Sequence, residues 1–373
     1  MTSMEIWLRL AAVKGVNGAK AHECLSQLPL CAEFDRQGTL SPCLTPRQRQ
    51  RFNQYRSADI DATLRWLEHP DHHFVRYSDE AYPHRLRDLA CPPPALFING
   101  DISCLDSRQL AMVGSRRCTV YGEQWGTYFA AALARCGLTI TSGLASGIDG
   151  ISHRGALDVK GHTVAVLGSG LQNIYPPQHR KLAERIVGEG GALVSEFVLD
   201  AGPLASHFPY RNRIISGLSI GVLVVEATAR SGSLVTARYA LEQGKDVYAL
   251  PGPLGNPGTE GTHWLIQQGA YLITQPKEIL DQLGSGLNWL TLEQDKIIYA
   301  TEREVELPFA DVLANVGDEV TPVDVVAERA GQPVPEVVIK LLELELAGWI
   351  AVVPGGYVRL RRAGHVRRTH VLV

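Results

Sequence analysis

The sequence predicts an α/β fold: a doubly wound, mostly parallel, Rossmann-like sheet with a small helical domain before it and a winged helix after it. Between residues 106 and 285, short apolar runs alternate with helical stretches. The runs are apolar at consecutive positions, which indicates strands buried on both faces and a parallel sheet covered by helices on both sides. Before residue 71 and after residue 300, helical patterns dominate.

The α/β region is expected to contain seven strands with helices between them. The apolar runs expected as strands are 110–114, 138–141, 163–167, 192–196, 220–227, 246–250 and 270–273. The helical stretches are 121–137, 148–161, 176–190, 209–218, 234–245 and 262–269. Ligands of such sheets bind beyond the carboxyl ends of the strands, so each loop that follows a strand is a candidate site.

Three domains are expected, together with a connector and a linker. They are a helical domain similar to SAM or helix–hairpin–helix modules (1–70), a connector packed on the central domain (71–105), a Rossmann-like domain (106–285), a linker (286–300) and a winged-helix domain (301–373).

A turn bracketed by Gly15 and Gly18 joins the first two helical stretches. It resembles a helix–hairpin–helix, whose backbone amides can hold a phosphate, and a plain helical corner is the alternative. Within the connector, the run from Cys91 to Pro94 excludes both helix and central strand, so residues 95–98 are expected to add an edge strand.

The last domain is expected to hold three helices followed by two strands around Pro354–Gly356. Its third helix carries Glu336, Glu343 and Glu345 against a single Lys340. Because phosphates repel an acidic helix, this module is expected to contact protein rather than to read bases. The basic tail that follows could simply be a solvated chain end. It contains Arg361, Arg362, Arg367 and Arg368.

The composition is typical of a globular cytoplasmic protein. The formal net charge is −3, so any nucleic-acid site has to come from local clustering of cations. The seven cysteines are an odd number without a CxxC pair, which argues against a disulfide framework and fits a reducing cytosol. No secretory signal and no apolar run long enough for a membrane helix is expected.

The loop after the first predicted strand of the α/β region reads Gly114, Ser115, Arg116 and Arg117. A glycine at a strand end lets the backbone turn sharply and approach a ligand closely. Arginine offers planar, bidentate donors that suit phosphate, so these residues are expected to bind DNA. The alternative is an arginine paired with a neighbouring carboxylate.

The loop after the second predicted strand is rich in small residues and opens a helix. Ser142, Gly143, Ser146 and Gly147 are expected to present backbone amides to an anion at the helix start. Asp149 could instead cap that helix itself.

A third cluster lies between Phe208 and Arg213. Arg211 and Arg213 are expected at or near a helix start, where the macrodipole disfavours cations and a bound anion would compensate. Phe208 and Tyr210 alternate with these charges, and that mixture suits single-stranded nucleic acid, whose bases are free to stack. Asn212 belongs to the same predicted site. The alternative is a structural network of these arginines with Glu196 or Glu226.

The fourth loop contributes Ser231, Gly232 and Ser233, which are expected either to bond phosphate or to cap a helix. Several common motifs are absent. No GxGxxG follows the first strand, no GxxxxGK[ST] is present, and the histidines have no metal-ligand spacing, so no cofactor or metal is expected.

These motifs together resemble the DprA/Smf family of DNA-processing proteins. The matching segments, in the family's order, are 114–116 (GSR), 142–149 (SGLASGID), 165–176 (AVLGSGLQNIYP), 195–197 (SEF), 208–219 (FPYRNRIISGLS) and 224–237 (VVEATARSGSLVTA). The resemblance implies a dimeric, cytoplasmic, non-enzymatic protein that binds and protects incoming single-stranded DNA and loads RecA onto it in transformation or recombination. It carries over as DNA contacts Gly114, Ser115, Arg116, Phe208, Arg211, Asn212 and Arg213.

Two positions depart from the family pattern. Members often have a lysine after the Tyr-Pro pair and another before the Phe-Pro pair, where this chain has Pro177 and the run Ala205–His207. The predicted site is therefore less basic than is usual in the family.

The fold is also similar to that of nucleotide phosphoribohydrolases with a PGGxGTxxE loop, which is the alternative function. This chain has Val235, Thr236 and Ala237 where the catalytic glutamate is needed. Glu226 and Glu260 are more distant candidates for acid–base catalysis, so the enzyme is the less favoured interpretation.

Overall fold

The computed structural model describes residues 2–26, 44–283, 309–317 and 319–360. The chain divides into two compact units, Met1–Leu290 and Thr291–Val373, and each is described by itself. The predicted linker 286–300 and the basic tail lie outside the described residues.

A nine-stranded sheet forms the centre of the first unit, in the order β1-β2-β6-β5-β4-β3-β7-β8-β9. Seven strands run parallel: β3 Gln109–Val113, β4 Thr139–Ser142, β5 Thr163–Val166, β6 Ala192–Ser195, β7 Gly221–Val224, β8 Asp246–Ala249 and β9 Tyr271–Leu272. The seven predicted strands are confirmed. The strand order reverses between β3 and β7, the kind of place where doubly wound sheets bind their ligands.

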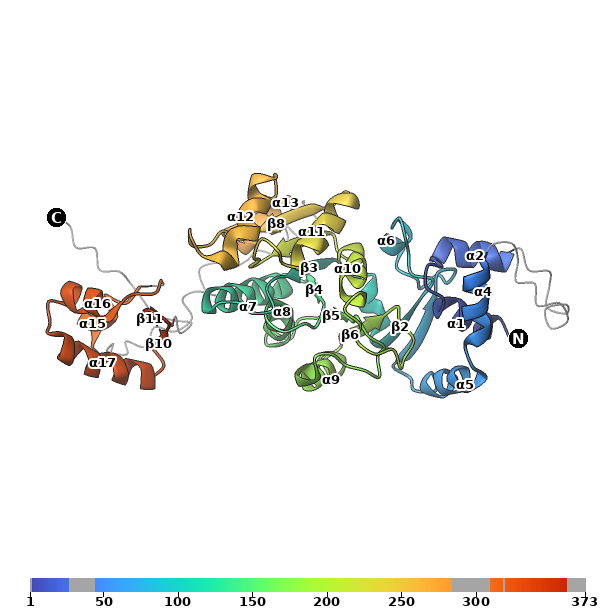
Figure 1. Ribbon diagram of the computed structural model, residues 1–373, viewed down its shortest axis with the longest axis horizontal. Helices are drawn as coiled ribbons and strands as arrows, with labels where there is room; N and C mark the ends of the chain where they lie inside the picture. The colour runs from blue at the N-terminus through green and yellow to red at the C-terminus, as the bar shows by residue number, and fades with distance from the viewer. Residues whose placement is uncertain (1, 27–43, 284–308, 318, 361–373) are drawn as a thin grey trace. The chain divides into compact units, whose positions relative to one another are not determined.

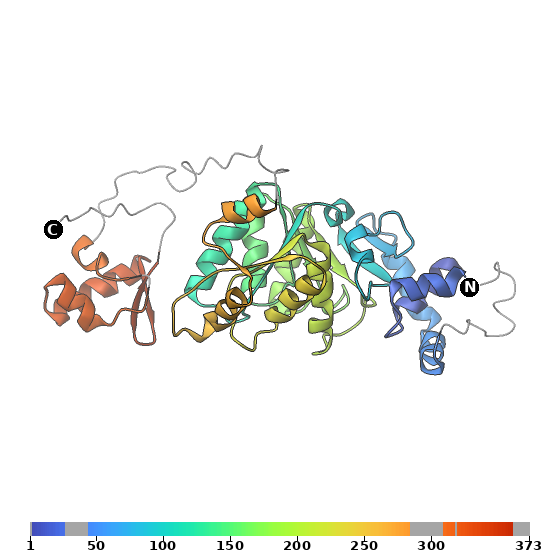
Figure 2. The ribbon, with the colours of Figure 1, turned by 90° about the horizontal axis from the view of Figure 1, so that it is seen from above.

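Helices cover both faces of this sheet (Figures 1 and 2). The helices between the parallel strands are α7 Val120–Arg135, α8 Ile148–Leu157, α9 Arg180–Gly188, α10 His207–Leu218, α11 Ser233–Glu242 and α12 Glu260–Gln267. Successive residues of a strand face opposite layers. Val164 and Val166 pack with Ile214 of α10, whereas Ala165 packs with Ile186 of α9. This two-sided burial explains why the strands are apolar at consecutive positions.

Residues 72–100 complete the sheet. β1 His72–Arg76 pairs antiparallel with β2 Ala95–Gly100, and β2 pairs antiparallel with β6 on its other side. The segment 95–98 is therefore a strand, but its predicted place at the sheet edge is wrong because β1 lies outside it. The polar start of β1, with His72 and His73, gave no apolar run from which to predict that strand.

The described residues of the N-terminal part of the first unit form the helices α1 Ser3–Ala11, α2 Gly18–Ser26, α4 Pro46–Gln54 and α5 Ser57–Trp66. In the turn before α2, the Gly18 amide donates to the Pro92 carbonyl oxygen at 2.8 Å. The Asn17 side chain caps the helix by accepting from the Lys20 amide. Because the protein itself uses the Gly18 amide, the geometry favours the plain helical corner over a phosphate-holding hairpin. The short elements of the unit are α6 His84–Arg87, α13 Pro276–Gln282, η1 Ile102–Leu105, η2 Pro177–His179 and η3 Pro257–Thr259.

The second unit has the elements of a winged helix. They are α15 Ala310–Leu313, α16 Val323–Ala330, α17 Val334–Leu346, and a hairpin of β10 Ile350–Val353 with β11 Gly356–Arg359. Its own apolar core contains Val326, Leu341 and Trp349. Within the ranges that the structure describes, no helix combines the length and the hydrophobicity required to cross a bilayer.

Candidate nucleic-acid interface

The loops after β3, β5 and β6 meet at the carboxyl edge of the sheet, and the first turns of α10 lie across them. The Arg116 guanidinium carbon is 5.4 Å from the centre of the Phe208 ring. That ring lies 5.5 Å from the ring of Tyr175 and packs on Gly168, where a Cβ would come within 2.8 Å of it. The predicted Arg116 and Phe208 are thus brought together by elements far apart in sequence.

Tyr175 was not among the predicted site residues, although it lies within a matching motif. Its side chain is exposed, as is that of Tyr210, which follows Phe208 by two residues in α10. A tyrosine in the loop after a parallel strand is the signal that would have identified it, since that loop ends at the ligand-binding edge.

The β3 loop holds its two arginines outward by local bonds. The Ser115 amide donates to the Glu226 carbonyl oxygen at 2.7 Å, and the Ser115 hydroxyl bonds both the amide and the carbonyl of Arg117. Gly114 approaches Ile148 and the Glu226 carbonyl, not a ligand: a Cβ there would lie 2.6 Å from the Ile148 side chain. Arg116 and Arg117 are exposed, and neither has an ion-pair partner among the described residues.

Arg211 points into the protein and not outward. Its guanidinium donates to the carbonyl oxygens of Gly143 and Val166, and its Nε donates to the Asn212 side chain. Gly143 makes room for it, since a Cβ there would lie 2.5 Å from Arg211 Nη2. Burial lowers the Arg211 pKa to about 10, and nearby Asp149 partly opposes this shift, so the group remains charged at neutral pH.

The predicted anion seat after β4 is filled by the protein itself. One carboxylate oxygen of Asp149 accepts from the amides of Gly143 and Ala145, at 3.2 and 3.4 Å. Ser142 is buried and donates to the Met112 carbonyl. The expectation that these groups face an external anion is therefore wrong. Burial raises the Asp149 pKa, and the charge of Arg211 counteracts part of that rise.

In the same loop, Ser146 is exposed and Gly147 is half-buried. Gly147 has a φ of +75° and lies against the Ser115 carbonyl oxygen, where a Cβ would come within 2.2 Å. This position requires glycine because the β3 and β4 loops touch there.

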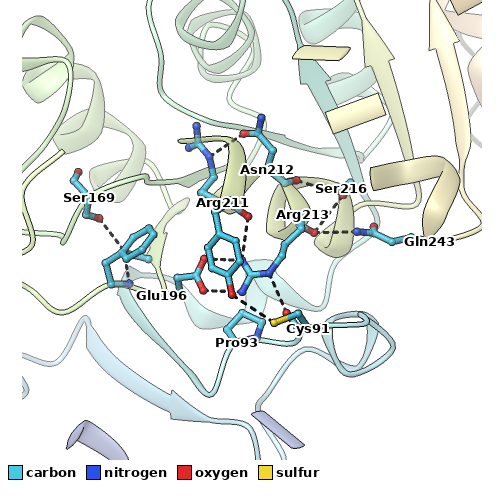
Figure 3. A network of polar contacts seen from close by, with 12 residues as sticks. Cys91, Pro93, Ser169, Glu196, Arg211, Asn212, Arg213, Ser216 and Gln243 are labelled. Atoms are coloured by element: carbon cyan, nitrogen blue, oxygen red, sulfur yellow. Dashed lines mark hydrogen bonds and ion pairs between the residues drawn. The ribbon is translucent and has the colours of Figure 1, made fainter. Parts of the chain in front are cut away.

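Arg213 is held in a buried ion pair with Glu196 (Figure 3). Its Nη1 and Nη2 donate to the two carboxylate oxygens at 2.6 and 2.7 Å, and its Nε donates to the Cys91 carbonyl. The Tyr210 ring covers the guanidinium at 3.9 Å. Burial opposes the charge, but Glu196 outweighs it and raises the Arg213 pKa. The structural network considered as the alternative is therefore confirmed for this arginine.

The reasoning that placed both arginines at a helix start was also wrong. Helix α10 begins at His207, so Arg211 and Arg213 lie beyond its first turn. Here the compensation for the charge comes from Glu196 and from backbone carbonyls, and no external anion is needed.

The β7 loop is linked to α10 through Asn212, whose side-chain amide donates to the Gly232 carbonyl at 3.4 Å. The hydroxyls of Ser231 and Ser233 bond each other at 2.7 Å, and Ser231 accepts from the Ser233 amide. Gly232 is exposed, whereas Ser233 is buried. The serines thus make local turn bonds, and neither caps the helix with its side chain, because the N-cap residue of α11 is Gly232.

Glu226 is buried and, among the described residues, has no ion pair with Arg116, Arg211 or Arg213. Its carboxylate accepts from the Thr119 amide at 3.1 Å and from the Thr119 hydroxyl at 2.6 Å. Among the described residues, no cluster of three His, Cys, Asp or Glu side chains could hold a metal ion.

We call this edge the Arg116 rim; it consists of the exposed Arg116, Arg117, Tyr175 and Tyr210 and the half-buried Phe208. Guanidinium groups can bind phosphates, and neighbouring aromatic rings can stack on unpaired bases. Arg211 and Arg213 hold α10 in position beneath it.

The sheet order and the flanking modules define a Rossmann-like α/β protein with an N-terminal helical domain and a C-terminal winged helix. The chain belongs to the DprA/Smf family. The family model for DNA recombination-mediator protein A matches residues 73–284. Those for the SMF/DprA SAM domain and the DprA winged helix domain match residues 1–65 and 299–356.

Relatives support this assignment over the whole chain. The chain is 57% identical to Protein Smf of Escherichia coli, over all of both chains. It resembles the X-ray structure of DNA processing protein A from Streptococcus pneumoniae with a TM-score of 0.63 and 34% identity, over 76% of this chain and 98% of that one. The structure of DNA processing protein A from Helicobacter pylori, described for its single-stranded DNA binding mode, matches with a TM-score of 0.52 and 31% identity, over 57% and 95%.

Proposed function

We propose that this protein binds single-stranded DNA along the Arg116 rim, protects it, and loads RecA onto it during transformation or recombination. The observation that carries the proposal is the cluster of Arg116, Phe208 and Tyr175, in which an exposed guanidinium lies over one aromatic ring and a second ring lies beside the first. This is the combination that grips a sugar–phosphate chain while bases stack beside it.

The contacts proposed for DNA differ from those expected from sequence. Arg116, Arg117 and Asn212 are the proposed donors to phosphate, with Tyr175 and Phe208 as stacking faces. Gly114, Ser115, Gly143 and Gly147 shape the loops, and Gly232 is the exposed position of the β7 loop.

Partners and location are part of the same proposal. The relative from Helicobacter pylori is described by its single-stranded DNA binding, which supports a nucleic-acid ligand for the shared domain. We propose a homodimer, a contact with RecA and a cytoplasmic location from the resemblance to the family. Analytical ultracentrifugation tests the dimer, and RecA filament growth on coated single strands, with and without this protein, tests loading.

The decisive test is fluorescence anisotropy with labelled oligo-dT and with a duplex of equal length, at several salt concentrations. Wild type is expected to prefer the single strand and to weaken steeply with salt. The variant Arg116→Ala/Phe208→Ala should lose most of this binding, while Arg135→Ala, at the end of α7, should retain it. Full binding by the double variant would contradict the proposal.

A further inference from the structure

We propose that the N-terminal helical domain carries a second phosphate-binding surface, which extends the path of the same DNA strand beyond the Arg116 rim. It consists of Arg47, Arg49 and Arg51 on α4 and Lys14 in the turn before α2; we call it the α4 surface. This inference rests on the proposed function of the rim, and it adds a role for a domain that lies outside the α/β fold.

The charge of this domain is opposite to that of the whole chain. Residues 1–65 contain nine Lys and Arg against six Asp and Glu, whereas the chain has a net charge of −3. Helix α4 itself has three arginines and no acidic residue. All three arginines are exposed, as is Lys14. Such a local excess of cations is the electrostatic footprint of a backbone-binding surface.

Among the described residues, the arginines of α4 differ from their neighbours in having no ion-pair or hydrogen-bond partner. Within the described part of this domain, Arg9 donates to the carbonyls of Phe52 and Tyr55, and Arg56 is paired with Asp59. The described residues offer no ion pair or hydrogen bond to any of the three α4 side chains. Their donors are therefore free for a ligand.

Their positions on the helix are also unfavourable without a ligand. Arg47 lies in the first turn of α4, where the macrodipole disfavours a cation, and that turn holds no acid. Arg47 and Arg51 are four residues apart and so repel each other along one side of the helix. A bound phosphate chain would relieve both effects.

The α4 surface is fixed close to the rim. The Gln48 side chain donates to the Gly15 carbonyl at 3.1 Å and accepts from Lys20 Nζ at 3.3 Å, which ties α4 to the turn that carries Lys14. Burial lowers the pKa of His207, the first residue of α10, and the Lys14 ammonium lowers it further. Phe208 of the rim is the next residue.

Apolar packing holds this arrangement in place. Leu8 and Phe52 of the helical domain share one buried cluster with Leu171 and Leu199, which belong to the loops after β5 and β6. Asp200, next to Leu199, acts electrostatically on Tyr55 and Arg56 at the end of α4 and the start of α5, so its charge would repel a phosphate on that side. A strand leaving the rim is therefore expected to run past Lys14 and away from Asp200.

The chemistry predicts contacts to the backbone alone. No exposed aromatic side chain lies within the described part of α4, so bases have no stacking face there. Binding at the α4 surface should be independent of sequence and should act only on strands long enough to reach it.

The test compares the full-length variant Arg47→Gln/Arg49→Gln/Arg51→Gln with wild type on a series of oligo-dT strands. Lengths from about 4 to about 30 nucleotides span the usual site sizes of about 4–16 nucleotides. The matched control, Arg135→Gln/Lys160→Gln/Arg329→Gln, removes the same charge from exposed positions elsewhere. Each variant is expected to fold, because glutamine is a good helix former. Circular dichroism checks this.

The triple α4 variant is expected to bind the shortest strands like wild type and to lose tenfold or more on the longest. Its salt slope on long strands should fall by about 2, at about 0.7 for each phosphate contact removed. Equal behaviour of the α4 variant and the control at every length would overturn this inference and leave the rim proposal intact. Failure of wild type to bind any length would overturn both.

Discussion

Two pairs of arginines lie at the same edge of the sheet, and they differ in solvent exposure and in the partners that the protein supplies. Arg116 and Arg117 are exposed, with a phenylalanine ring beneath the first. Arg211 and Arg213 are 3% and 5% exposed, and their donors are used by Gly143, Val166, Cys91 and Glu196. Residue type alone therefore does not identify a ligand-binding cation. What distinguishes the pairs is whether the fold supplies a partner.

The largest expected effect comes from breaking the buried ion pair. Glu196→Ala would leave the Arg213 guanidinium buried without a counter-charge, so we expect a loss of about 3–5 kcal/mol in the free energy of unfolding. The midpoint of urea unfolding measures it. Glu184→Ala, at an exposed position of α9, should change stability by less than about 0.5 kcal/mol. Similar midpoints for the two variants would show that the ion pair does not stabilise α10.

Substitution in the exposed pair is expected to weaken DNA binding and to leave the free energy of unfolding almost unchanged. Arg116→Ala should weaken oligo-dT binding by about ten- to a hundredfold, the value of a charge-assisted hydrogen bond of about 1.5–3 kcal/mol. Its free energy of unfolding should stay within about 0.5 kcal/mol of wild type. Arg116→Lys keeps the charge but loses the planar fork, so its loss should be smaller. A destabilised Arg116→Ala variant that still binds DNA would show that Arg116 has a structural role and does not bind the ligand.

The same rule can be tested on a buried histidine of α8. His153 is fully buried beside Thr163, as expected of a hydrogen-bonding histidine, and burial lowers its pKa to about 3. The folded-state pKa of His153 is depressed, so the unfolded chain takes up the proton first as the pH falls. The free energy of unfolding is therefore highest above about pH 6.5 and decreases below it. We expect a loss of about 2 kcal/mol between about pH 6.5 and pH 5.

The variant His153→Gln cannot titrate and should show a shallower fall of unfolding free energy over that range. His162→Gln, at an exposed position, should keep the wild-type slope. An unchanged slope in His153→Gln would contradict the assignment of this pH dependence to the buried ring.

The smallest expected effect is a gain. Pro177 is exposed, follows Tyr175 by two residues, and stands where family members often have lysine. Pro177→Lys should add about one phosphate contact, which steepens the salt slope for single strands by about 0.7. Pro177→Ala separates the loss of the ring from the gain of charge and should leave the slope as it is. No change in slope for the lysine variant would place Pro177 away from the DNA path.

Much of the fold was predictable because it depends on local pattern. Consecutive apolar residues such as those of β5 and β7 signal strands buried on both faces, and their alternation with helices leaves few topologies. Strand β1 was not predicted because His72 and His73 open it, and only its pairing with β2 makes it a strand. The place of β2 inside the sheet depends in turn on β1.

The sequence by itself determined the class of fold, the modules on either side, and which loops reach the carboxyl edge of the sheet. It also placed Arg116 and Phe208 in the candidate site. Only the tertiary structure decided that Asp149 accepts hydrogen bonds from the amides of its own loop, that Glu196 pairs with Arg213, and that Tyr175 lies at the rim. The physical reason is range: periodicity is carried by neighbouring residues, whereas a buried charge is satisfied by whichever group the fold brings within hydrogen-bonding distance.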